Sequence, residues 1–138
     1  MTQTTVFEVV GGQPFFDALV ERFYERVDVD PTLRPLYPTD LAPGKRALAL
    51  FLGQYWGGPQ SYSAEKGHPR LRMRHAGFAI AERERGAWLS AMLAALDDAD
   101  APQAAVSMMR DYFTTASTAM INAGGRPGSA TGQTIQDE

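Results

Sequence analysis

The chain has 138 residues, of which 44% are apolar, and a net charge of −3, as expected for one globular domain with its own core. This charge balance gives no reason to expect nucleic acid or an anionic membrane as a partner. The absence of cysteine excludes disulfides, thiolate nucleophiles, iron–sulfur clusters and thiolate-bound zinc.

The N-terminal segment MTQTTVFEVVGGQPFF has no basic stretch followed by an apolar one, so it does not resemble a secretory signal. No apolar run approaches the roughly 20 residues that a membrane-spanning helix needs. We therefore expect a cytoplasmic protein without an integral membrane segment.

The first half of the chain predicts helices separated by short breaks. After the Gly11-Gly12 pair, apolar residues recur at helical spacing: Phe16, Leu19, Val20, Phe23 and Val27. The Asp30-Pro31 pair is typical of the N-cap and first turn of another helix. That helix must be short, because Pro35 and Pro38 follow.

The next predicted helix begins near Pro43 and ends at Gly57-Gly58-Pro59. Its apolar stripe contains Leu48, Phe51, Leu52 and Tyr55. Turn residues predict a loop over residues 59–69. Three further helices follow, over about 71–79, over about 81–96 with Trp88, Met92 and Ala95 aligned, and over a last segment with the stripe Val106, Met109, Phe113, Ala116 and Met120.

No stretch alternates as a half-buried strand would, so the fold class is all-α. Short helices separated by Gly and Pro favour helices that cross at steep angles, as in globins, over a bundle of four long rods. We expect residues 1–123 to form the domain. Residues 124–138, GGRPGSATGQTIQDE, have almost nothing apolar to bury and are predicted to be a disordered tail.

The chain has two histidines, and they differ in their surroundings. His68 precedes a proline, whereas His75 lies among apolar residues in RLRMRHAGF. His75 is either a partly buried histidine bonded to a backbone carbonyl or an axial metal ligand. One imidazole suffices for haem, whereas zinc or non-haem iron needs a cluster of three or four ligands that this sequence does not offer. If a metal is bound, haem is the simplest choice.

The arginines beside His75 offer a second observation. Arg70, Arg72 and Arg74 alternate with apolar residues and could hold anionic haem propionates, or they could form a solvated cationic face. Arg74, next to His75, is the first candidate for a propionate contact. Arg46 and Tyr62 are weaker candidates.

Four aromatic residues lie on or beside apolar stripes: Tyr24, Tyr37, Tyr55 and Trp88. Each is either a core or boundary residue or one of several donors in a shared ligand pocket. A hydrogen bond to a partly charged ligand contributes roughly 1.5–3 kcal/mol, and each 1.4 kcal/mol changes affinity about tenfold. Several such donors would slow oxygen release too much for a good carrier.

The segment QYWGGPQSYSAEKGHPRLRMRHAGF, Gln54 to Phe78, is long enough to be specific. Together with RFYERV, LRPLYP and ERGAWL, it resembles the truncated (2-on-2) haemoglobins, and most closely the actinobacterial type of their group II. The resemblance covers about residues 5 to 122. It implies a shortened globin fold in which two helical pairs enclose haem b, the iron protoporphyrin IX.

By this resemblance, His75 corresponds to the proximal iron ligand. Tyr24, Tyr37 and Trp88 correspond to the residues that stabilise the ligand on the distal side. Gly44 lies near the position of the distal histidine in ordinary globins, where a small residue would leave an opening for ligands. The further expected haem contacts are Arg46, Leu48, Phe51, Tyr62, Leu71, Arg74, Phe78 and Met92. Ala47 and Ala49 replace arginines that relatives often carry, so Arg46 or Lys45 is expected to substitute.

The resemblance implies a five-coordinate haem that binds oxygen and other small ligands such as nitric oxide, carbon monoxide or peroxide. Redox chemistry of oxygen and nitric oxide is expected rather than transport, with an external reductant because the chain has no flavin or nicotinamide domain. The alternatives are a peroxidase-like enzyme, which would lack a distal His–Arg pair, and an oxygen store or ligand sensor. A helical module without cofactor is the remaining alternative. Some family members are homodimers, which leaves the assembly state open.

Overall fold

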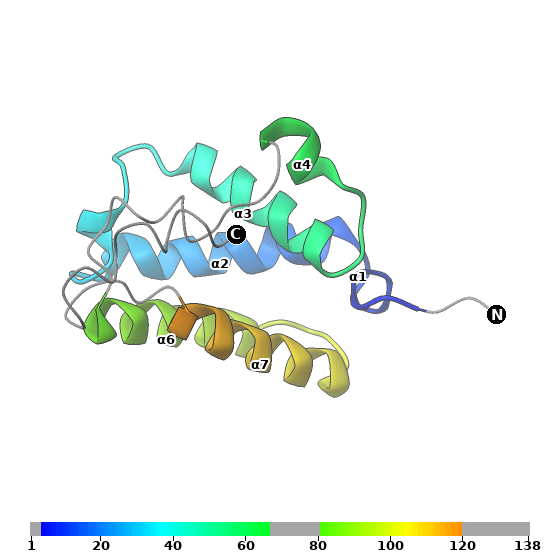
Figure 1. The fold of residues 1–138 in the computed structure, drawn as a ribbon. Coiled ribbons are helices and arrows are strands. Elements are labelled where there is room, and N and C mark those ends of the chain that lie inside the picture. Colours follow the sequence, from blue (N-terminus) through cyan, green and yellow to red (C-terminus); the bar gives the residue numbers. More distant parts are fainter. Residues whose placement is uncertain (1–3, 67–80, 120–138) are drawn as a thin grey trace.

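The computed structural model describes residues 4–66 and 81–119, and every regular element in those ranges is helical. They are α1 (Val6–Val9), α2 (Gln13–Val29), the 3₁₀ helix η1 (Arg34–Leu36), α3 (Ala42–Tyr55), α4 (Ser61–Lys66), α6 (Glu82–Asp97) and α7 (Gln103–Ala119) (Figure 1). The predicted all-α class is confirmed. The predicted helix near 71–79 and the predicted tail 124–138 lie outside the described residues.

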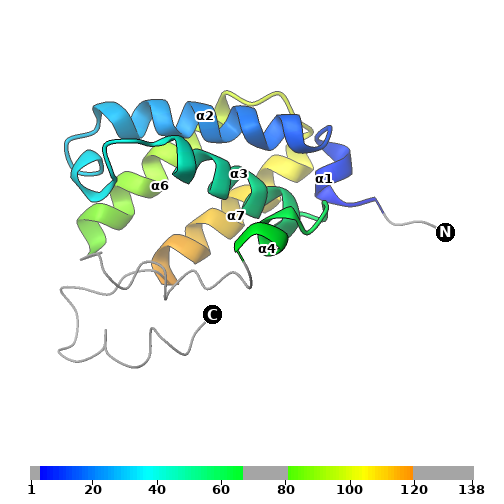
Figure 2. The same cartoon turned by 90° about the horizontal axis from the view of Figure 1, so that it is seen from above.

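Helix α2 is the centre of the fold. It packs against α3 on one side and against α6 on the other, while α7 packs on α6 and α4 on α3 (Figures 1 and 2). The stripe predicted for α2 forms the middle of the core, with every member at most 1% exposed: Phe16, Leu19, Val20, Phe23 and Val27. Burial of such side chains from two neighbouring helices provides most of the stability of a helical domain.

Helices α6 and α7 also bury most of their predicted stripes. Met92 and Ala95 of α6 are fully buried, and Trp88 lies half-buried at the edge of the core. Met109 and Phe113 of α7 are at most 1% exposed. Among the described residues, no helix has both the length and the apolar character needed to cross a membrane.

Helix α1 was not predicted, because four residues are too few to show a helical period. A capping box holds it: Thr5 Oγ1 accepts the Glu8 N–H at 3.1 Å, and the Glu8 carboxylate accepts the Thr5 N–H at 3.1 Å. A Cβ added to Gly58 would lie 2.5 Å from Phe7 Cε1. The glycines after α3 therefore end that helix, as predicted, and also let the segment around α1 approach it closely.

The prediction of a loop over residues 59–69 was wrong for part of its length, because Ser61–Lys66 form helix α4. The Gln54 side chain from α3 accepts the Ser63 N–H at 2.9 Å and donates to the Ser63 hydroxyl at 2.8 Å. Tyr62 is 4% exposed and packs edge-on against Phe51, with ring centroids 5.5 Å apart. These tertiary contacts outweigh the local turn preference of the serines.

A short helix does follow Asp30, as predicted, but it begins at Arg34 with Leu33 and not Asp30 as its N-cap. Asp30 Oδ1 accepts the N–H groups of Thr32 at 2.8 Å and Leu33 at 3.0 Å. The chain then forms a turn and η1 instead of an α-helix. Pro35 has no N–H for an α-helical hydrogen bond, which favours this tighter path.

Candidate functional site

Three of the residues predicted to contact a ligand come together from separate elements. Tyr24 belongs to α2, Tyr37 follows η1, and Trp88 belongs to α6. The Tyr24 and Tyr37 rings meet edge-on at 5.6 Å and 80°, and the Trp88 side chain lies close enough to Tyr37 to influence its pKa. Phe23 lies beside this group, with its ring 5.4 Å from that of Trp88. We call Tyr24, Tyr37 and Trp88 the distal cluster.

Both phenols of the distal cluster keep their protons at neutral pH. Tyr24 is 5% exposed, and burial raises its pKa to about 12. Burial also raises the pKa of Tyr37, the nearby Tyr24 raises it further, and the nearby Trp88 side chain lowers it in part. Within the part of the chain that the structure describes, the Tyr24 hydroxyl has no hydrogen-bond partner. The cluster therefore offers a protonated donor to a further group.

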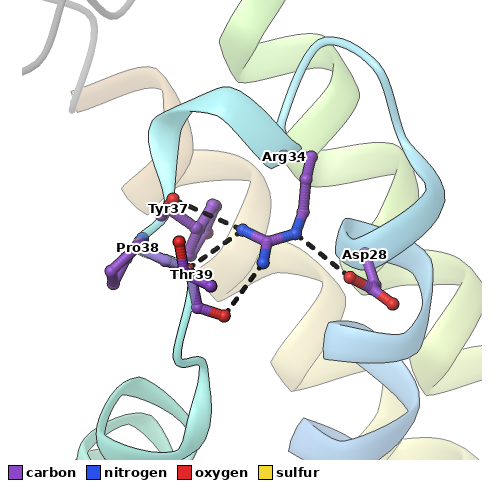
Figure 3. Close-up of polar contacts among 5 residues, drawn as sticks. All are labelled: Asp28, Arg34, Tyr37, Pro38 and Thr39. Carbon is purple, nitrogen blue, oxygen red and sulfur yellow. Dashed lines mark hydrogen bonds and ion pairs between the residues drawn. The ribbon is translucent and has the colours of Figure 1, made fainter.

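An arginine holds the backbone that carries Tyr37 (Figure 3). Arg34 Nη1 donates to the carbonyls of Tyr37 at 3.3 Å and Pro38 at 3.0 Å, and Nη2 donates to Thr39 at 3.1 Å. Its Nε donates to Asp28 Oδ1 at 3.0 Å, at the end of α2. The Arg34 guanidinium thus links the loop to α2 and fixes the backbone position from which the Tyr37 side chain extends. Sequence analysis missed Arg34, since no local pattern marks the three carbonyls that it binds.

Helix α3 forms the wall beside Tyr24. On the same helix, Leu48 is half-buried and Phe51 is 8% exposed, with the Phe51 ring against that of Tyr62. A Cβ added to Gly44 would lie 2.7 Å from the Tyr24 hydroxyl oxygen. The space beside Gly44, expected to be an opening for ligands, therefore holds the Tyr24 phenol. Without a side chain at residue 44, the hydroxyl can approach the helix backbone this closely.

The other predicted contacts divide between core and surface. Met92 is fully buried and Tyr62 is 4% exposed, so both lie within the packed interior. The side chain of Arg46 is 65% exposed and forms an ion pair with Glu65 of α4. Tyr55 does not join the distal cluster, because it is 51% exposed and stacks on Tyr112 at 4.3 Å.

The predicted proximal side lies outside the described residues. It comprises the proposed ligand and the contacts expected around it: His75, Leu71, Arg74 and Phe78, together with His68, Arg70 and Arg72. Their roles stay predictions from the sequence.

The chemistry of the distal cluster is compatible with haem. Among the described residues, no three His, Cys, Asp or Glu side chains gather as they would to hold a metal ion directly. Neutral O–H and N–H donors set among apolar side chains instead suit a ligand that carries partial negative charge. Such a ligand needs a separate electron-rich centre, which haem provides.

Comparisons with known proteins identify the family to which this fold belongs. The family model described as "Bacterial-like globin" matches residues 5–122. The chain belongs to this bacterial-like globin family. Membership implies a haem cofactor and the binding of small diatomic ligands such as oxygen.

Individual relatives agree with this assignment. The Group 2 truncated hemoglobin YjbI of Bacillus subtilis is 46% identical over 86 residues, which cover 62% of this chain and 65% of that relative's length. The crystal structure of the hemoglobin from Chloroflexus aurantiacus is 54% identical, with a TM-score of 0.86 over 87% of this chain and 99% of that one. The hemoglobin from the actinobacterium Thermobifida fusca is 47% identical, with a TM-score of 0.86 over 88% and 100%. The resemblance to group II truncated haemoglobins is thereby confirmed.

Proposed function

We propose that this protein binds haem b through His75 and uses the distal cluster to hold oxygen and other diatomic ligands. The observation that supports this most directly is the meeting of Tyr24, Tyr37 and Trp88 from three elements, with protonated phenols at its centre. The Tyr24 hydroxyl makes no hydrogen bond to another described residue, so it is free to donate to a bound ligand.

Each residue has a distinct part in this proposal. Haem, when bound, supplies the iron centre at which a diatomic ligand is held. His75 holds the iron from the proximal side, and Arg74 binds a propionate. Leu48 and Phe51 exclude water and keep the local dielectric low, which strengthens the hydrogen bonds from Tyr24 and Trp88.

These donors favour oxygen retention over delivery. One hydrogen bond to a partly charged ligand contributes roughly 1.5–3 kcal/mol, which corresponds to about a tenfold to hundredfold slower release. A protein that releases oxygen slowly suits reaction with a second small molecule better than transport. We therefore infer that nitric oxide is oxidised to nitrate at the expense of the bound oxygen, with an external reductant restoring the starting state.

The first test is the absorption spectrum of the purified protein, recorded oxidised, then reduced, then with oxygen and with carbon monoxide. A strong Soret band with a five-coordinate reduced form is the expected result. His75→Ala is expected to lose stoichiometric haem, while the matched variant His68→Ala retains it. A colourless protein that does not take up added haem, or full retention in His75→Ala, would contradict the proposal.

The second test concerns the distal donor. Trp88→Phe is expected to speed oxygen dissociation about tenfold or more, because it removes a donor that contributes about 1.4 kcal/mol or more. Trp56→Phe is the matched control, since Trp56 is the other tryptophan and lies away from the cluster, against Tyr55 and Tyr112. Equal rates in both variants would remove Trp88 as a donor.

The redox reaction has its own measurement. Oxygen-loaded protein mixed with an equal amount of nitric oxide should yield one nitrate per site. If the oxygen instead leaves unchanged and no nitrate forms, the protein stores or senses oxygen without turnover.

A further inference from the structure

Gly44 stands out because its backbone does not explain the absence of a side chain. Glycines with positive φ among the described residues are Gly11, Gly12 and Gly57, and Gly44 is not one of them. Residue 44 lies inside the first turn of α3, where alanine is the better helix former. Local structure therefore favours a side chain at this position, and the reason for glycine must come from a tertiary contact.

The tertiary contact is with the Tyr24 phenol. A Cβ at residue 44 would lie 2.7 Å from the hydroxyl oxygen, but 3.5 and 3.8 Å from the nearest ring carbons. Only the oxygen is too close, since the ring carbons would be at ordinary contact distances. Among the described residues, the hydroxyl is therefore the one group that requires glycine at residue 44.

The Tyr24 ring has little freedom to yield. Tyr24 is 5% exposed, and its ring packs edge-on against Phe23 at 5.3 Å and against Tyr37 at 5.6 Å. A side chain at residue 44 would therefore move the hydroxyl only by tilting the ring against its neighbours or by shifting α3. Either movement changes where the hydroxyl points.

We infer that Gly44 is a positioning residue that sets the place of the Tyr24 hydroxyl and thereby tunes its hydrogen bond to the bound ligand. The inference rests on the proposed function for its effect on ligands, but the contact itself does not. Glycine at residue 44 lowers the helix preference of α3, but it allows the Tyr24 hydroxyl to lie in a defined position against that helix.

The test is Gly44→Ala in two backgrounds, the natural chain and Tyr24→Phe, with oxygen dissociation measured by stopped flow. In the natural background we expect dissociation at least about fivefold faster, because a displaced hydroxyl bonds the ligand less well. With phenylalanine at residue 24 there is no hydroxyl to displace. Adding Gly44→Ala should then change the rate by less than about twofold.

Thermal unfolding of the protein as purified gives a readout that needs no ligand. In the Tyr24→Phe background, Gly44→Ala should raise the unfolding midpoint, because alanine stabilises α3 and meets only ring carbons. In the natural background the same change should lower the midpoint. Gly86→Ala in α6 is the matched control, since no atom of the described residues lies within 4 Å of its added Cβ, and it should raise the midpoint in both backgrounds.

The outcomes separate this inference from the proposed function. A midpoint that rises equally in both backgrounds, or an oxygen rate that Gly44→Ala leaves unchanged or slows in the natural chain, would overturn the inference. A protein without haem would end the proposed function and the ligand effect together. Gly44→Ala would still have to shift the unfolding midpoint in opposite directions in the two backgrounds if Gly44 positions the Tyr24 hydroxyl.

Discussion

Two aromatic clusters among the described residues contain both tyrosine and tryptophan but differ in the placement of their polar atoms. The distal cluster lies between α2, α6 and the loop after η1. The second, which we call the surface cluster, lies where α3 ends beside α7 and contains Tyr55, Trp56 and Tyr112. In it, Tyr55 stacks on Tyr112 at 4.3 Å with an interplanar angle of 33°, and Trp56 meets both rings edge-on.

Burial alone does not distinguish the two clusters. It raises the pKa of Tyr112 just as it raises that of Tyr24, and a nearby Tyr55 adds to the effect at Tyr112. The difference lies in how the distal cluster is supported. Gly44 leaves room for one hydroxyl, and Arg34 fixes the backbone of the neighbouring tyrosine. Packed aromatic rings by themselves therefore indicate only a core, whereas hydroxyl groups held in defined positions by their neighbours indicate a binding site.

The largest expected effect comes from the ring that lies between the clusters. Phe113 is 1% exposed, with its centroid 6.0 Å from Trp88 and 5.4 Å from Tyr112. Phe113→Ala should lower the free energy of unfolding in urea by about 3–5 kcal/mol, because it leaves a cavity that rigid neighbours cannot fill. Met108→Ala, at a residue 51% exposed, should change it by about 0.5 kcal/mol or less. Comparable losses in the two variants would contradict this view of the core.

The next prediction compares one hydroxyl from each cluster. Tyr24→Phe should speed oxygen dissociation about tenfold, since a donor to a partly charged ligand is lost. Tyr112→Phe removes a hydroxyl of the surface cluster, where no ligand is expected, and should leave the rate within about twofold. If both variants accelerate release equally, the distinction between the clusters fails.

The support of Tyr37 can be weakened without altering a ring. Arg34→Gln should lower the free energy of unfolding by about 1–2 kcal/mol, because three carbonyls lose a charged donor although water can reach part of them. Asp28→Asn removes only the exposed ion pair and should cost about 0–1 kcal/mol. An equal cost in the two variants would mean that the carbonyl contacts contribute little.

The last effect is expected only at alkaline pH and should be shared by both clusters. The pKa of Tyr24 rises from 10.0 to about 12 on folding, so the unfolded chain releases this proton first. The stabilisation is complete below pH 10 and is lost as pH rises toward about 12. Tyr24→Phe should therefore flatten the fall of the unfolding free energy in that range. Tyr112→Phe should do the same, and a different response would show that more than burial sets these pKa values.

The helices with long apolar stripes could be predicted from the sequence because helical periodicity is local. The stripe from Phe16 to Val27 states which face of α2 is buried without reference to any partner. Helices α1 and α4 are too short to show such a period: a local capping box holds α1, and side-chain contacts with α3 hold α4. The capping pattern TVFE at residues 5–8 was the available signal for α1, whereas the bond from Gln54 to Ser63 had none.

For the site, sequence by itself determined the candidates: Tyr24, Tyr37 and Trp88 as donors and His75 as the expected ligand, all from residue types and a family resemblance. It also determined that residue 44 has no side chain. Only the tertiary structure decided that the Tyr24 hydroxyl occupies the space beside Gly44, that Arg34 holds the Tyr37 loop, and that Tyr55 belongs to a different cluster. Periodicity reports which face of a helix is buried, but the direction of a polar tip depends on how separate helices pack against one another.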